Sequence, residues 1–79
     1  MTIKDATAER VQQLCRERHM RLNELANRAG VTPSSVYSMM DPRRREVSVN
    51  LVMKLCDGLD LSIRSFYDHS MFDHIDSEL

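Results

Sequence analysis

The sequence predicts an all-α fold in a single small domain. Aromatic residues make up only 5% of the 79 residues and Trp is absent, while Leu, Val, Ala and six Met supply most of the apolar volume. This composition suits packed helices better than a sheet. A hydrophobic content of 42% supports one compact core, near the length below which a core becomes marginal. We therefore expect a compact all-helical domain and not a two-domain enzyme.

The first helix is expected over residues 4–19, where no Gly or Pro interrupts the helical periodicity. Its apolar row consists of Val11, Leu14 and Cys15, extended by Ile3 and Ala6. The polar side chains between them are expected to face water, namely Arg10, Gln12, Gln13, Arg16 and Glu17.

Two short helices joined by a tight turn are predicted over residues 22–29 and 33–40. Apolar residues recur at offsets 0, 3, 4 and 7 in Leu22, Leu25, Ala26 and Ala29. Gly30 can adopt the left-handed conformation that ends a helix. Thr32 can cap the next helix, and Pro33 suits a first helical position because no N–H is needed there. The first of the two helices lacks a side-chain cap, since Arg21 precedes it.

The rest of the chain predicts two further helices, over residues 50–58 and 61–67. Their cap candidates are Ser48 or Asn50 for the first and Ser62 for the second. The core positions are Val52, Leu55, Cys56, Leu59, Leu61, Ile63 and Phe66. Residues 69–79 keep Met71, Phe72, Ile75 and Leu79 at helical spacing in an acidic segment, which either docks on an apolar surface or frays.

The pattern Leu25-Ala26-x-x-x-Gly30-Val31-Thr32, followed by Val36, marks the turn. It resembles the Cro/CI-type helix-turn-helix family, which is lambda-repressor-like and also called XRE. The resemblance extends from about Val11 to Tyr67. It implies a five-helix lambda-repressor-like DNA-binding domain over residues 1–68, with the helix-turn-helix at helices 2 and 3. Residues 69–79 would then form an acidic C-terminal tail, as a short helix or a dimer contact.

The resemblance also implies how DNA would be bound, with the second helix of the motif in the major groove and neighbouring segments on phosphates. The base-contacting positions are Pro33, Ser34, Tyr37 and Ser38. The phosphate-contacting positions are Arg21, Asn23, Thr32, Ser35, Arg43, Arg44 and Arg45. Family members often place Gln or Arg where this chain has Pro33, Ser34 and Ser38. A Ser hydroxyl can bond to more than one kind of base, and Pro offers only an apolar edge. We therefore expect this helix to discriminate only modestly between base sequences.

Two of these assignments have a purely structural alternative. The ring of Tyr37 either packs on a neighbouring side chain or contacts DNA. The arginines of residues 43–45 either face solvent in a loop or contact phosphate, and their place directly after the helix favours phosphate.

The net charge of −1 is unusual for a protein that binds phosphates, but the charges are unevenly distributed. Residues 1–67 carry 11 basic against 8 acidic groups, a net of +3, and the remaining residues carry four acidic groups. The chain is therefore a weakly basic body with an acidic tail.

These observations predict a sequence-specific transcriptional regulator, a repressor, that binds double-stranded DNA as a homodimer on a pseudo-palindromic operator. The dimer-interface candidates are Ile63, Tyr67, Met71, Phe72 and Ile75, an apolar row that has to be covered. The alternative is a protein-interaction module or antitoxin-like protein on the same fold, with weak or no DNA binding.

Other functions find little support in the sequence. Cys15 and Cys56 form no Cys-x-x-Cys pair and are expected as buried thiols, and the three His lack metal spacing, so no metal or cofactor is expected. Arrangements typical of catalysis are missing, and an enzyme is not expected. Without a membrane-length apolar run or the layout of a signal peptide, the chain is expected to be cytoplasmic.

Overall fold

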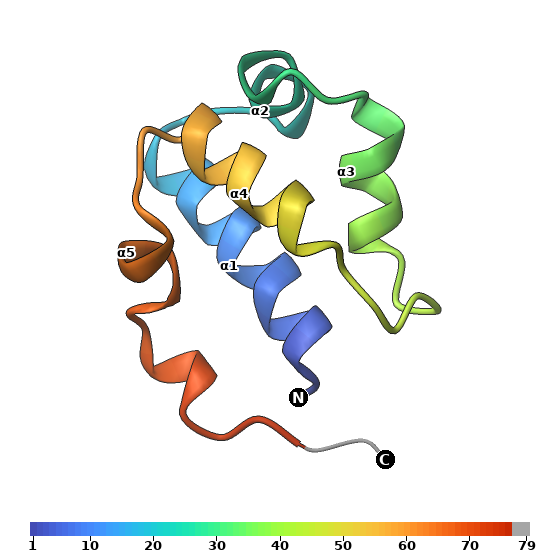
Figure 1. Ribbon diagram of the computed structural model, residues 1–79, viewed down its shortest axis with the longest axis vertical. Coiled ribbons are helices and arrows are strands. Elements are labelled where there is room, and N and C mark those ends of the chain that lie inside the picture. The colour runs from blue at the N-terminus through green and yellow to red at the C-terminus, as the bar shows by residue number, and fades with distance from the viewer. Residues whose placement is uncertain (77–79) are drawn as a thin grey trace.

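Five α-helices make up the fold of residues 1–76, which are the residues that this computed structural model describes (Figure 1). They are α1 (Ile3–Glu17), α2 (Leu22–Ala29), α3 (Pro33–Met40), α4 (Val49–Gly58) and α5 (Ile63–Tyr67), followed by a single 3₁₀ turn, η1 (Ser70–Phe72). No strand occurs within this described range, and the all-α prediction is confirmed. Residues 77–79 at the end of the predicted acidic tail, including the apolar Leu79, lie outside the described residues.

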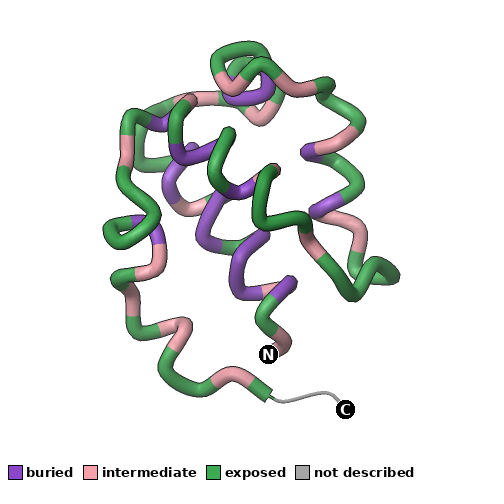
Figure 2. The backbone as a smooth tube through the Cα atoms, viewed as in Figure 1, coloured by how far each residue is buried: buried purple, intermediate pink, exposed green. Residues whose placement is uncertain are grey.

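The core lies between α1 and α4, where Figure 2 shows most of the buried positions. Every helix contributes at least one side chain that is completely shielded from solvent. These residues include Val11, Leu25, Ala26, Val36, Leu55 and Phe66. α2 packs closely against α4, since a Cβ on Gly58 would lie 3.0 Å from the backbone nitrogen of Ala29. The periodic apolar rows predicted for these helices therefore meet in one core.

Hydroxyl side chains begin four of the helices. Thr2, Thr32, Ser48 and Ser62 each accept a hydrogen bond from the backbone N–H three residues further along. The cap at Ser62 is confirmed, and Ser48 is used instead of Asn50, so that α4 begins one residue before the predicted position. Arg21 makes no side-chain cap to α2, as predicted.

Two helix boundaries differ from the prediction by two residues. α1 ends at Glu17 because His19 adopts a left-handed φ of 53°, and the N–H of Met20 then closes the helix on the Cys15 carbonyl oxygen at 2.9 Å. α5 begins at Ile63, two residues late, because the extended backbone of Ser62 is its cap. Ile63 is 42% exposed, so its predicted place in the core is wrong.

The expectation that Arg10 and Gln13 face water is also wrong. Arg10 is only 8% exposed, and its guanidinium donates to the carbonyl oxygens of Phe66 at 2.6 Å and Ser65 at 3.0 Å. The oxygen of the half-buried Gln13 side chain accepts a third hydrogen bond from Arg10 at 2.8 Å. Carbonyls at the end of a helix have no partner within the helix. Arg10 is buried because its guanidinium supplies hydrogen bonds to the last carbonyls of α5.

A second cation, Lys4, is buried near the start of α1 and is 1% exposed. Its Nζ donates to the carbonyl oxygens of Asp41 at 2.8 Å and Met39 at 3.3 Å. It also lies 3.2 Å from a carboxylate oxygen of Asp5. Lys4 thereby joins the first turn of α1 to the last turn of α3.

The segment after α5 docks on the chain's own core. The Phe72 ring lies 4.8 Å from the Tyr67 ring and 6.4 Å from the Phe66 ring, measured between centroids. Further on, the backbone N–H of Asp76 donates to the carbonyl oxygen of Met1 at 3.0 Å. Of the two outcomes considered for this segment, docking is the one observed over the described residues.

Candidate nucleic-acid interface

The turn between α2 and α3 has the geometry that its sequence predicts. Gly30 adopts a left-handed φ of 72°. Its N–H donates to the Asn27 carbonyl oxygen at 3.3 Å, and the N–H of Val31 donates to that of Ala26 at 3.0 Å. This pair of hydrogen bonds ends α2 at Ala29, and α3 starts at Pro33 after three intervening residues. The turn thereby sets the angle at which α3 crosses α2.

α3 is amphipathic, with Val36 and Met39 buried against the core. All four predicted base-contacting residues lie on its exposed side, namely Pro33, Ser34, Tyr37 and Ser38. Tyr37 has the largest of these side chains and is 51% exposed. The structure therefore brings these four residues together on one outward surface, which we call the α3 face.

Three hydroxyls cluster where α3 begins. The Oγ1 of Thr32 lies 2.8 Å from the Oγ of Ser35 and 3.1 Å from that of Ser34, and it caps the helix through the Ser35 N–H. Thr32 is exposed and Ser35 is half-buried. These predicted phosphate-contacting residues thus lie beside the free N–H groups of a helix N-terminus, which attract anions.

Residues 41–48 form the loop after α3, and we call residues 43–45 the arginine loop. Within it, Arg43 is held by Asp41. One carboxylate oxygen accepts from the Arg43 backbone N–H at 2.9 Å and from Nε at 3.1 Å, and the other accepts from Nη2 at 2.9 Å. The Arg43 side-chain hydrogen bonds, followed by the backbone one, lower the pKa of the Asp41 carboxyl from 3.8 to about 2.

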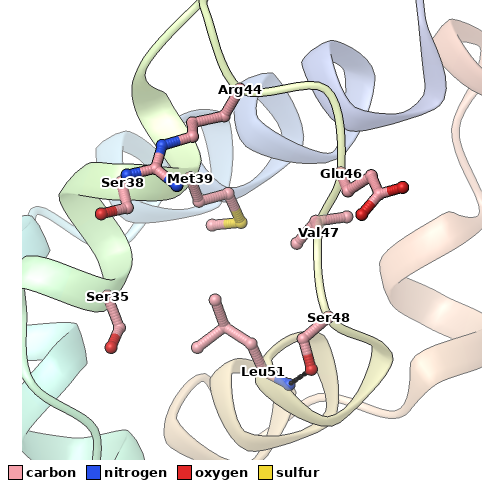
Figure 3. Close-up of a pocket in the computed structure, with 8 residues that line it drawn as sticks. All are labelled: Ser35, Ser38, Met39, Arg44, Glu46, Val47, Ser48 and Leu51. Atoms are coloured by element: carbon pink, nitrogen blue, oxygen red, sulfur yellow. Dashed lines mark hydrogen bonds between the residues drawn. The ribbon is translucent and has the colours of Figure 1, made fainter.

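Arg44 adopts a different orientation. Its side chain extends from the loop back towards α3, and its guanidinium ends over Ser38 (Figure 3). The two residues line one open hollow of about 120 Å³ between α3 and the start of α4. The other lining residues are Ser35, Met39, Glu46, Val47, Ser48 and Leu51. The arginine loop and the α3 face are therefore adjacent parts of one surface.

The model of the Cro/C1-type HTH DNA-binding domain matches residues 10–69. The chain belongs to this family. No curated protein and no solved structure matches the sequence. Membership makes the chain a DNA-binding regulator with DNA as its partner, and it confirms the resemblance drawn from the turn.

The remaining predicted contact residues of this Cro/C1-type domain lie elsewhere. Arg21 and Asn23 are exposed at the start of α2, at the opposite end of that helix from the turn. Among the dimer candidates, the rings of Tyr67 and Phe72 pack on each other, while Ile63 is exposed. Met71 and Ile75 are half-buried.

Sequence reasoning missed two residues that shape the site, Lys4 and Asp41. Lys4 stands at the helical spacing of the apolar row through Ala8, Val11 and Cys15, and a charge at such a position was a signal of burial. Asp41 lies two residues before Arg43, which is a spacing at which a side chain can bond the backbone of a turn.

Within residues 1–76, no helix is long and apolar enough to cross a membrane, and no three His, Cys, Asp or Glu are grouped to hold a metal ion. Cys15 and Cys56 are free and buried, as predicted, and burial raises the pKa of both thiols.

Proposed function

We propose that this protein is a sequence-specific transcriptional repressor that inserts α3 into the DNA major groove as a homodimer on a pseudo-palindromic operator. The observation that carries the proposal is the α3 face lying beside the arginine loop. The small side chains of Pro33, Ser34 and Ser38 allow the helix to approach base edges closely, and Tyr37 reaches further. Occupation of an operator excludes other proteins from the same DNA, which is why we assign repression.

Phosphate contacts would hold the domain in place. Thr32 and Ser35 stand at the N-terminus of α3, where backbone N–H groups favour an anion. Arg43, Arg44 and Arg45 follow at the other end of the helix, and Arg21 and Asn23 add contacts from α2. Phosphate binding of this kind fixes the register of a protein on DNA without reading its sequence.

A homodimer is proposed because a single α3 covers few base pairs. Two recognition helices related by two-fold symmetry double the interface and set the spacing of the half-sites. The interface candidates remain Ile63, Tyr67, Met71, Phe72 and Ile75. Ile63 is 42% exposed whereas the other four candidates are half-buried, so it is the first position to test.

Site selection from a random DNA library, followed by gel shifts over a range of salt concentrations, tests this function. We expect symmetric sites, with log affinity falling by about 0.9 per phosphate contact for each unit of log salt. Replacing Arg43, Arg44 and Arg45 by Ala should reduce that slope by about one for each phosphate contact removed. DNA binding that does not respond to salt would contradict the proposal.

The matched control carries Arg16→Ala, Lys54→Ala and Arg64→Ala, which remove three cations from α1, α4 and α5. All three side chains are exposed, so the net charge changes by the same amount without disturbing the core. This variant should keep a salt slope closer to that of the wild type. An equal fall in slope for both variants would show that overall charge matters and the arginine loop does not.

A second candidate function is protein binding in the manner of an antitoxin, and one observation favours it. Several large apolar side chains are exposed on α1 and α4, with Val49 at 79%, Met53 at 52% and Ile3 at 48%. Ile3 and Val49 also line one hollow, and an exposed apolar patch often marks a protein interface. Co-purification after nuclease treatment tests this candidate, since a stoichiometric partner retained without DNA would favour it and its absence would favour the DNA-binding function.

A further inference from the structure

No side chain of the α3 face, Tyr37 included, presents two separate polar atoms to one base. Ser34 and Ser38 each offer a single hydroxyl, and Pro33 offers only an apolar edge. Specific contacts in the major groove most often use Arg, whose guanidinium donates to O6 and N7 of one guanine. A residue outside α3 would have to supply such a contact.

Arg43 is poorly suited to that task. Its Nε and Nη2 donate to both carboxylate oxygens of Asp41, at 3.1 and 2.9 Å. These are two of the nitrogens that a guanidinium uses to bind a base edge or a phosphate bidentately. The negative charge of Asp41 also offsets that of Arg43 at the DNA surface.

Arg44 is better suited to make a bidentate contact with a base. No hydrogen bond or ion pair engages its guanidinium among residues 1–76. The side chain lies along α3 with its guanidinium over Ser38, at the edge of the hollow between α3 and α4 (Figure 3). Its donors are therefore available beside a predicted base-contacting residue.

The backbone of Arg44 is held in place at the same time. Its N–H donates to the Asp41 carbonyl oxygen at 3.0 Å, and that oxygen also accepts from the buried Nζ of Lys4 at 2.8 Å. The start of the arginine loop is thereby anchored to α1. A side chain on an anchored backbone loses less conformational entropy when it binds than one on a mobile loop.

We propose that Arg44 is a base-reading residue of the DNA interface, which donates to O6 and N7 of a guanine next to the base pair that faces Ser38. The inference rests on the proposed insertion of α3 into the major groove. It replaces phosphate contact as the main role of Arg44. The outer side of α3 and the arginine loop would then read sequence together.

The test compares the sites that wild type, Arg44→Ala and Arg44→Gln select from a random DNA library, with affinities measured for each base at each position. Wild type should prefer guanine at one position of each half-site by about 5- to 150-fold, which corresponds to one bidentate contact. Arg44→Ala should lose that preference and keep the others. Arg44→Gln should move it towards adenine, because Gln is bidentate to N6 and N7 of adenine.

Arg43→Ala is the matched control, since it removes the same charge from the adjacent position. It should keep the guanine preference. If Arg44→Ala instead weakens binding to all sequences equally and lowers the salt slope by about one, Arg44 contacts phosphate and the inference is overturned. That outcome leaves the proposed function intact, whereas a wild-type protein without salt-dependent DNA binding overturns the proposed function itself.

Discussion

Lys4 and Arg10 on α1 carry the same charge as Arg43 and Arg44 after α3, in opposite surroundings. The two α1 cations are almost completely buried and donate to carbonyl oxygens near the ends of α3 and α5. The two loop cations are exposed, and one of them is held by a carboxylate. Basic residues counted from the sequence therefore overstate the positive charge that faces DNA. Two of them serve the fold, and a third is largely neutralised.

The contrast has an electrostatic basis. A buried cation loses its hydration, and that cost is offset only where strong acceptors surround it. The last carbonyls of a helix carry partial negative charge and lack partners within the helix, so they are suitable acceptors. An exposed arginine remains hydrated, and its energy depends little on its neighbours. The α1 cations should therefore govern stability, and the loop cations should govern DNA binding.

The largest effect on stability is expected from Arg10→Ala. The substitution leaves the carbonyl oxygen of Phe66 without its Arg10 donor and removes one of the two donors to that of Ser65, and we expect a loss of about 3 kcal/mol in the free energy of unfolding. Urea unfolding followed by circular dichroism measures it. Arg16→Ala, on the exposed side of the same helix, is the control and should change the midpoint little. Equal urea midpoints for the two variants would show that Arg10 contributes no more to stability than the exposed Arg16.

Lys4→Met should cost about 2 kcal/mol, because it keeps the apolar stem in the core but removes the donors to the carbonyl oxygens of Met39 and Asp41. This variant should also bind DNA more weakly at temperatures where it is fully folded, since the end of α3 and the start of the arginine loop lose their anchor. Fluorescence anisotropy with a labelled site measures the DNA affinity. Lower stability with unchanged DNA affinity would show that α3 is positioned without Lys4.

Arg44→Ala should leave the urea midpoint unchanged, because no hydrogen bond or ion pair of its guanidinium is lost among residues 1–76. Its effect should appear only in DNA binding. Comparing the DNA affinities of Arg44→Ala and Lys4→Met then separates two effects. The first variant loses only the contact of Arg44 with DNA, and the second loses the hydrogen bonds that anchor the end of α3. A clear fall in the stability of Arg44→Ala would contradict the assignment of the loop cations to DNA.

The smallest effect concerns the pH dependence of the Asp41–Arg43 pair. The pKa of Asp41 is lowered to about 2 in the folded chain, so the pair contributes stability above the ordinary value of 3.8 and loses it as the pH falls through about 2. Because the pair is exposed, NMR titration of the carboxyl group is a more sensitive measurement than unfolding. The midpoint should move towards 3.8 in Arg43→Ala, and an unchanged midpoint would show that Arg43 is not the cause.

Much of the fold was predictable because it depends on local chemistry. The left-handed Gly30, the caps at Thr32 and Ser62, and the buried side of α4 all follow from residues within one or two helical turns. The α3 face followed in the same way, since helical periodicity leaves those positions outside once Val36 and Met39 are inside. Ile63 was misplaced because α5 is too short for periodicity to show which side is buried.

The amino-acid sequence by itself determined that this chain is a helical Cro/C1-type domain with its turn at Gly30, because each signal acts between near neighbours. Only the tertiary structure decided what its cations do. Lys4 finds its acceptors 35 and 37 residues away, and Arg10 finds one 56 residues away, so no local pattern could pair them. The orientation of Arg44 over Ser38 likewise depends on how the loop after α3 folds back against α1.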